Sequence, residues 1–333
     1  MKHILMLATG GTIASSENEE GLSPSVASAE ILRRVPEIGK ICRVDTLQLF
    51  NLDSTNVTPA HWLKIKEAIA EHYEDYDGFV ITHGTDTMAY TAAALSYLIQ
   101  GSPKPIVITG SQKSILQNDT DARRNLLDSF RYAADDDSHD VSLVFDGKVI
   151  LGTRARKERT KSYNAFSSVD YPEIAVIRDG KLIRYLAAKE YPAGAQPAFY
   201  SHLETGILLL TLIPGMDPRV LYELREDYRA VICQSFGVGG LPGGGDGEFA
   251  RAVGDWLGSG RPFVMMTQVP YEGSDMDIYQ VGKQVKERYP VIEAYNMTLE
   301  AAVTKLMWIL GQTQDPEKIR ELFYRPVQND LIR

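Results

Sequence analysis

Four short segments of the sequence combine hydroxyl, carboxylate and glycine residues that could support chemistry on a small polar ligand. They are Gly10-Gly11-Thr12, Asp53-Ser54-Thr55, His83-Gly84-Thr85-Asp86 and Ser111-Gln112. Each segment taken alone is typical of a turn or a helix cap. Each also follows directly on an apolar run, and the four together favour one binding site over four unrelated turns.

The first segment, in LMLATGGTIAS, is compatible with a tight turn, a phosphate cradle or the seat of a nucleophile. The cradle is least favoured, because the spacing matches neither G-x-G-x-x-G nor G-x-x-x-x-G-K-[ST], and Glu17, Glu19 and Glu20 would repel a phosphate. As a nucleophile, the Thr12 hydroxyl would need a group that accepts its proton. A lysine with a lowered pKa can serve, and RARKERTK, residues 154–161, offers several cations between which the pattern does not choose.

The elements that must position these segments alternate between strand-like and helix-like runs. We expect strands at Ile4–Ala8, Val44–Phe50, Phe79–Thr82, Ile106–Thr109 and Val141–Phe145, and helices from Thr58-Pro59 onward, over Thr87–Ile99 and over Ala122–Ala134. This alternation predicts βαβ units and a parallel sheet. Open parallel sheets bind ligands beyond the carboxyl ends of their strands. With the common strand order 2-1-3-4, all four polar segments would share one rim.

Two Asp-Gly pairs, in VFDGKVIL and VIRDGKLIRY, predict hairpins that close the first domain. We therefore expect an α/β fold of two domains. Residues 1–187 would form a larger, flavodoxin-like parallel sheet with terminal hairpins, and 188–205, rich in Pro, Ala and Gly, a linker. Residues 206–333 would form a smaller Rossmann-like α/β domain, with strands in ILLLTLIPG, AVICQSFG and FVMMTQV and helices near 218–225, 248–257, 279–288 and 298–310.

Composition excludes several classes of function. Lys and Arg total 35 against 44 Asp and Glu, a net charge of −9, so we expect no nucleic-acid partner. Cys42 and Cys233 are far apart and outside any ligand-type spacing, which predicts buried thiols in a reducing compartment and no metal site. The first apolar run is too short for a signal peptide or a membrane span. These features predict a cytoplasmic protein without membrane contact.

The segments ATGGTIA and THGTDTM resemble the paired signatures of the bacterial-type L-asparaginases. NLDSTNVTP, VITGSQ and YNMTLEAAVTKL are similar to the cytoplasmic, type I branch, and the resemblance extends over essentially the whole chain. It implies hydrolysis of L-asparagine to L-aspartate and ammonia, two α/β domains, no cofactor, and a homodimer or homotetramer.

The resemblance also implies roles for individual residues. Thr12 corresponds to the nucleophile that attacks the side-chain amide, and Thr85, Asp86 and Lys157 to its proton relay; Lys157 lies nine residues before Phe166 of NAFSS. Asp86 would also hold the substrate ammonium, and backbone N–H groups near Gly11 and Thr85 the oxyanion. The positions that match substrate contacts are Gly11, Asp53, Ser54, Thr55, Gly84 and Ser111.

Two positions depart from the family pattern. Leu22, in the lid SSENEEGLSPS, stands where many relatives carry Tyr, and Gly240 where many carry Asn in a loop that reaches the partner's site.

The sequence leaves open two alternatives to an asparaginase that acts on free L-asparagine. One is an amino-acid sensor that kept the pocket, motivated by the absent lid Tyr. The other is the amidase subunit of a tRNA-dependent amidotransferase, which the resemblance expects to carry an extra domain ahead of its first signature, whereas Thr12 lies at the start here.

Overall fold

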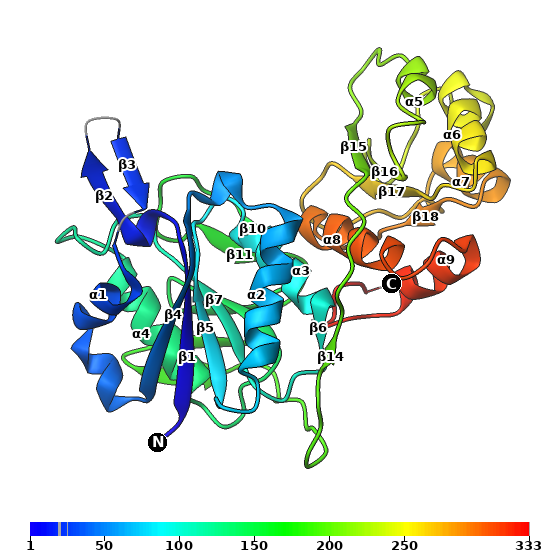
Figure 1. Ribbon diagram of the computed structural model, residues 1–333. Coiled ribbons are helices and arrows are strands. Elements are labelled where there is room, and N and C mark those ends of the chain that lie inside the picture. The colour runs from blue at the N-terminus through cyan, green and yellow to red at the C-terminus, as the bar shows by residue number, and fades with distance from the viewer. Residues whose placement is uncertain (19–20, 25, 333) are drawn as a thin grey trace. The chain divides into compact units, whose positions relative to one another are not determined.

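The computed structural model describes residues 1–18, 21–24 and 26–332. It contains two compact units, Met1–Ser201 and His202–Arg333 (Figure 1), which are described in turn. The predicted linker, 188–205, spans the residues at which the first unit ends, and part of it, β14 (Ala198–Phe199), pairs with β6 (Ile99–Gln100). No helix within the described residues is long and apolar enough to cross a membrane.

The first unit is built on an eight-stranded sheet whose strand order is β13-β12-β9-β8-β7-β5-β1-β4. Its strands are β1 (His3–Gly10), β4 (Arg43–Leu52), β5 (Gly78–Thr82), β7 (Ile106–Thr109), β8 (Val141–Phe145), β9 (Lys148–Leu151), β12 (Ala175–Arg178) and β13 (Lys181–Arg184). The strands from β4 to β8 are parallel. The expected order, second-first-third-fourth, is therefore confirmed.

Helices cover both faces of this sheet, as its apolar strands require. The helices are α1 (Ser28–Arg33), α2 (Pro59–Glu71), α3 (Met88–Leu98) and α4 (Ala122–Ala133). Figure 1 shows α1 and α4 on one side of the sheet, where Ile31 and Phe130 pack on Met6 and Val80, and α2 and α3 on the other. Thr58 caps α2 through a reciprocal contact with His61, as expected from Thr58-Pro59.

Both predicted hairpins are present. Phe145 pairs with Lys148 and Arg178 with Lys181, and each Asp-Gly turn is left-handed, with φ values of 50° and 73° at Asp146 and Gly147. Two further hairpins were not expected: β2 (Ser15–Asn18) with β3 (Gly21–Pro24), and β10 (Ala155–Lys157) with β11 (Phe166–Ser168). Their strands are short and polar or charged, so they carry no apolar alternation to detect. Position 22 lies in β3, but its side chain is outside the described part.

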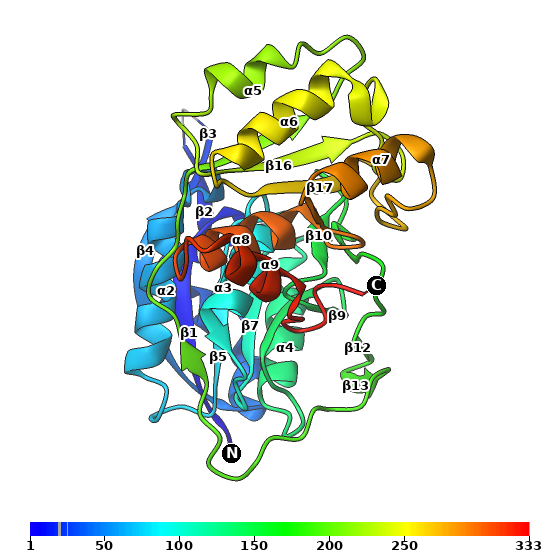
Figure 2. The same cartoon turned by 90° about the vertical axis from the view of Figure 1, so that its right-hand side faces the viewer.

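The second unit contains a four-stranded parallel sheet in the order β15-β16-β17-β18. Its elements are β15 (Ile207–Thr211), β16 (Ala230–Ser235), β17 (Phe263–Thr267), β18 (Ile292–Glu293), α5 (Arg219–Glu223), α6 (Glu248–Gly258), α7 (Gln280–Arg288), α8 (Leu299–Leu310) and α9 (Pro316–Tyr324). In Figure 2, α5 and α6 lie on one side of this sheet and α8 and α9 on the other. The expected α/β fold with a larger and a smaller domain is confirmed; α9, capped by Asp315, was missed.

Candidate active site

The four polar segments leave the sheet at the carboxyl ends of β4, β1, β5 and β7, which are adjacent strands. Glycines allow three of these segments to come into close contact. A Cβ on Gly11 would lie 2.3 Å from the Gly84 nitrogen, and one on Gly84 would lie 2.7 Å from Ser54 Oγ. Gly11 also has a φ of 80°, a left-handed value that favours glycine. The glycines of the first segment thus permit a close approach of backbones at this rim.

Thr12 opens a single 3₁₀ turn, η1 (Thr12–Ala14), directly after β1. The turn is held by Ala14 N–H and Ser15 Oγ, both donating to the Gly11 carbonyl at 3.0 Å. Gly11 N–H donates to Leu52 O at 2.9 Å, so it is already engaged. Thr12 is partly exposed, and within the described residues neither its hydroxyl nor its N–H has a hydrogen-bond partner.

Lys157 is the cation of the 154–161 run that reaches this rim. It ends β10, opposite Phe166 of β11. Its Nζ donates to Thr85 Oγ1 at 2.7 Å and to Asp86 Oδ1 at 2.6 Å. The Lys157 side chain is 15% exposed and that of Asp86 58%. The Lys157 side chain is therefore mostly buried, while the Asp86 carboxylate faces the solvent, where a ligand can reach it.

The segment after β4 joins this cluster through Ser54. Buried Ser54 Oγ accepts Asp86 N–H at 3.2 Å, and the Ser54 carbonyl accepts the Thr87 hydroxyl at 2.7 Å. Asp53 caps the turn η3 (Ser54–Asn56), where its Oδ1 accepts both the N–H and the hydroxyl of Thr55, at 2.9 and 2.8 Å. Asp53 and Thr55 thus pair with each other at the exposed surface, while Ser54 braces the loop after β5.

Of the two predicted polar residues after β7, Gln112 rather than Ser111 contacts the cluster. The fully buried Ser111 hydroxyl donates to Lys113 O within its own loop. Gln112 Oε1 accepts the Thr85 hydroxyl at 3.3 Å, and its Nε2 donates to Ser162 O at 3.1 Å. Gln112 lies in the polar segment, but no role for it was derived from the sequence, because the contact to the 159–162 loop depends on the fold.

Asp121 holds the backbone at Gln112 in place. Its carboxylate accepts Gln112 N–H at 2.9 Å and Lys113 N–H at 3.0 Å, and Asn125 Nδ2 at 3.2 Å. Burial raises the pKa of Asp121, although these hydrogen bonds oppose the shift. The loop after β7 is therefore tied to the start of α4.

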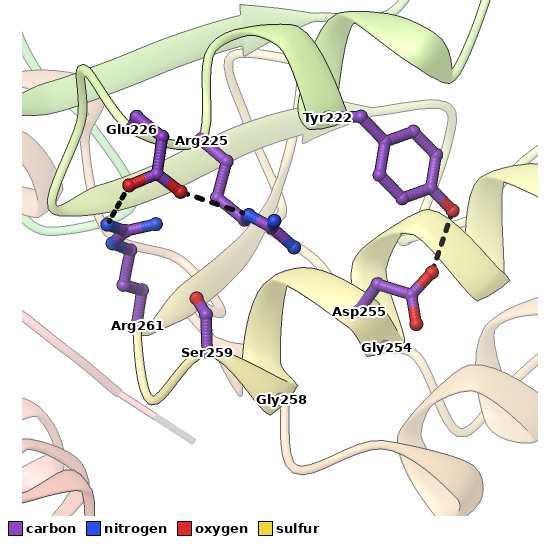
Figure 3. Close-up of a pocket in the computed structure, with 8 residues that line it drawn as sticks. All are labelled: Tyr222, Arg225, Glu226, Gly254, Asp255, Gly258, Ser259 and Arg261. Atoms are coloured by element: carbon purple, nitrogen blue, oxygen red, sulfur yellow. Dashed lines mark hydrogen bonds and ion pairs between the residues drawn. The ribbon is translucent and has the colours of Figure 1, made fainter.

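A separate cavity of about 510 Å³ lies on the second unit, between α5 and α6 (Figure 3). Its polar and charged side chains pair with one another: Tyr222 donates to Asp255 at 2.8 Å, and Glu226 lies 3.5 and 3.6 Å from Arg225 and Arg261. None of the predicted site residues lines it. Within the described residues, no group of three His, Cys, Asp or Glu side chains is placed to hold a metal ion.

Comparison with known proteins gives concordant results. Residues 3–190 match the family described as "Asparaginase, N-terminal", and residues 207–323 match the "Glutaminase/Asparaginase C-terminal domain". The chain is 37% identical to an L-asparaginase of Thermococcus kodakarensis, with 98% of each covered, and 32% identical to L-asparaginase 1 of Escherichia coli, with 99% and 98% covered. The solved thermostable L-asparaginase from Thermococcus kodakarensis has a TM-score of 0.91 at 35% identity, with 99% of each chain covered.

Several further relatives carry a different name, that of a glutamyl-tRNA(Gln) amidotransferase subunit. The chain is 32% identical to a subunit of the glutamyl-tRNA(Gln) amidotransferase of Methanopyrus kandleri, and the match covers 99% of this chain and 75% of that one.

Proposed function

This chain belongs to the asparaginase family, and from that membership we propose that it hydrolyses L-asparagine to L-aspartate and ammonia. The observation that carries the proposal is the convergence of Lys157 Nζ on Thr85 Oγ1 and Asp86 Oδ1, at 2.7 and 2.6 Å, beside the segment that presents Thr12. A nucleophile, a charged relay and an outward-facing carboxylate are the parts that transfer of an acyl group from an amino-acid amide requires.

In the proposed reaction, Thr12 Oγ1 attacks the side-chain amide carbon of asparagine, and the carbonyl electron pair moves onto oxygen. The N–H groups of Thr12 and Thr85 make no hydrogen bond elsewhere within the described residues. They are therefore available to hold the oxyanion. Because Gly11 N–H is engaged by Leu52, the part left to Gly11 is to let its backbone approach Gly84, where a Cβ would collide.

The proton released by Thr12 passes through Thr85 to the amide nitrogen, the C–N bond breaks, and ammonia leaves. Lys157 donates to Thr85 Oγ1, so its positive charge stabilises the negative charge that builds there during transfer. Water then attacks the acyl-enzyme and releases aspartate. Asp86, with its exposed carboxylate, holds the substrate ammonium, and Asp53, Ser54 and Thr55 provide the remaining contacts to the α-groups.

The test is ammonia release from L-asparagine and, separately, L-glutamine. We expect Thr12→Ala to lower kcat by at least about a thousandfold and Thr12→Ser to retain measurable turnover, with exposed Thr205→Ala as the matched control. Rapid acid quenching followed by mass spectrometry should find an aspartyl group on the peptide that contains Thr12. A Thr12→Ala variant with wild-type turnover would disprove the proposed nucleophile.

A second candidate is the amidase half of an amidotransferase, which the similarity to an amidotransferase subunit favours. Turnover of free asparagine by the isolated chain supports the asparaginase instead. Ammonia release that requires a partner subunit and a charged tRNA would support the second candidate. Tight asparagine binding in calorimetry without any ammonia release would identify a sensor.

We also propose a homodimer or homotetramer in a reducing, cytoplasmic setting, with no nucleic-acid or membrane partner. The support is the family membership, the net charge of −9, and two free, buried thiols, Cys42 and Cys233. Burial raises the pKa of Cys42 to about 11, which makes this thiol unreactive near neutral pH. Light scattering of the purified protein measures the assembly.

A further inference from the structure

His83 lies between β5 and the loop that carries Thr85 and Asp86, and it is fully buried. Its Nδ1 is 2.7 Å from the Gly84 carbonyl oxygen, and its Nε2 is 3.0 Å from Thr91 Oγ1 on α3. A ring buried in this way has no access to a substrate. Any effect it has on the reaction must pass through the groups that it contacts.

The chemistry of its partners determines which nitrogen of His83 carries the proton. The Gly84 carbonyl oxygen can only accept, so Nδ1 is the donor and Nε2 is left as an acceptor for the Thr91 hydroxyl. Thr91 Oγ1 in turn lies 2.9 Å from Trp62 Nε1, an indole N–H that can only donate. The hydrogen bonds therefore run in one direction, from Trp62 through Thr91 and His83 to Gly84.

Burial also keeps the ring neutral. It lowers the pKa of His83 to about 4, although the hydrogen bond to Gly84 opposes the shift. A protonated ring would donate from both nitrogens and would lose the bond that Thr91 donates to Nε2. The buried surroundings of His83 therefore stabilise the neutral ring with its proton on Nδ1.

The Gly84 carbonyl and the Thr85 N–H belong to one peptide unit, and the described chain has no cis peptide bond. In a planar trans peptide the C=O and the N–H point in opposite directions. Whatever holds the carbonyl therefore also sets the direction of the N–H. A glycine leaves this unit free to turn, because Gly84 has no side chain to restrict its backbone.

We propose that His83 is a positioning residue, which holds the Gly84 carbonyl and thereby aims the Thr85 N–H at the oxyanion formed on the substrate amide. This role rests on the proposed asparaginase reaction and deepens it. The hydrogen bond into the carbonyl also polarises the peptide and makes its N–H a better donor. His83 and Lys157 then act on the two ends of Thr85, the first on its N–H and the second on its hydroxyl.

The two amide replacements of histidine separate this role from simple packing. His83→Asn places an amide nitrogen near the position of Nδ1, so it can still donate to Gly84. His83→Gln reaches the position of Nε2, so it keeps the contact to Thr91 but leaves the carbonyl without its donor. We expect the Asn variant to keep kcat within about threefold, and the Gln variant to lose about ten- to a hundredfold in kcat with KM changed less than threefold.

Three measurements make the outcome decisive. Calorimetry should find that the Gln variant binds L-aspartate as wild type does, because the product carries no oxyanion at the amide carbon. Thr91→Val removes the hydroxyl that contacts His83 and should lower kcat, whereas Thr91→Ser keeps the hydroxyl and should preserve kcat. These two variants test the same role if the His83 variants do not fold. Nitrogen-15 NMR of wild-type protein should show the neutral ring protonated on Nδ1.

A Gln variant as active as the Asn variant, a loss that falls on KM as much as on kcat, or an Nε2-protonated ring would each overturn the role of His83. Wild-type protein that releases no ammonia would instead overturn the proposed function, and the NMR result would still decide the tautomer on which this inference depends.

Discussion

Lys157 Nζ lies 2.7 Å from Thr85 Oγ1, although 72 residues separate them in the chain. The contact joins a strand of a small hairpin to the loop after β5. It converts two ordinary side chains into a charge-assisted pair, which is stronger than a hydrogen bond between neutral groups. The proposed relay depends on this pair.

Replacing Lys157 by methionine should lower kcat by about a hundredfold or more, because the negative charge that builds on Thr85 Oγ1 loses its stabilising cation. The fold should survive, since methionine fills a similar volume. Ammonia release measures the effect, and Lys161→Met, at an exposed lysine of the same β10–β11 hairpin, is the control. Equal activity in both variants would contradict the proposed relay.

Gln112→Glu should lower kcat by about tenfold, because the carboxylate cannot donate to Ser162 O and would repel that carbonyl. Thr85 would then lose a fixed partner for its hydroxyl. Turnover of asparagine at saturating substrate measures the loss. Gln117→Glu, on the exposed part of the same loop, adds the same charge and should leave turnover unchanged.

Gly11→Ala should destabilise the first unit by about 1–3 kcal/mol and abolish measurable turnover. The added Cβ would lie 2.3 Å from the Gly84 backbone nitrogen, which cannot move without displacing Thr85. Urea unfolding and ammonia release together measure the two effects. The matched control is Gly39→Ala, where a Cβ meets no atom within 4 Å, and a similar loss there would argue against the steric explanation.

In the second unit, Lys305 Nζ lies 2.7 Å from Asp330 Oδ2, and both side chains are fully buried. Burial lowers the pKa of Lys305, although the Asp330 carboxylate opposes the shift. Asp330→Asn should cost about 3–5 kcal/mol of unfolding free energy, because it leaves the lysine buried without its counter-charge. Lys318→Ala, which breaks the exposed pair with Glu321, should change it by less than about 1 kcal/mol.

Stability should fall in acid partly because of His83. Its pKa is about 4 in the folded protein and about 6.5 in the unfolded chain, so between these values the unfolded state binds more protons. The contribution of the neutral His83 ring to the free energy of unfolding is fully present above pH 6.5. It is lost at up to about 1.4 kcal/mol per pH unit as the pH falls toward 4. Urea unfolding of wild type and His83→Asn across this range should show a steeper fall for wild type, and parallel curves would argue against a neutral, buried ring.

Much of the fold could be predicted because apolar residues are periodic. The buried runs of β1, β5 and β7 and the stripes of α2 and α4 follow directly from side-chain hydrophobicity, and the Asp-Gly turns require left-handed backbone. The strands β2, β3, β10 and β11 could not be predicted, because they are short and polar and their pairing depends on tertiary contacts. Helix α9 was missed although its Asp315-Pro316 start is a recognisable cap.

In the candidate site, too, some features could be predicted from the sequence and others depend on the fold. The order of residues along the chain was enough to show that hydroxyls follow successive strands. It predicted one rim for Thr12, Ser54 and Thr85 only with the common strand order 2-1-3-4, and the folded sheet has that order. The family resemblance singled out Lys157 within its run, and the folded chain shows that its Nζ reaches Thr85. Two features emerged only from the folded chain: Gln112 orients Thr85, and Leu52 engages the Gly11 N–H. Those contacts join segments far apart in the chain, so no local pattern of residues encodes them.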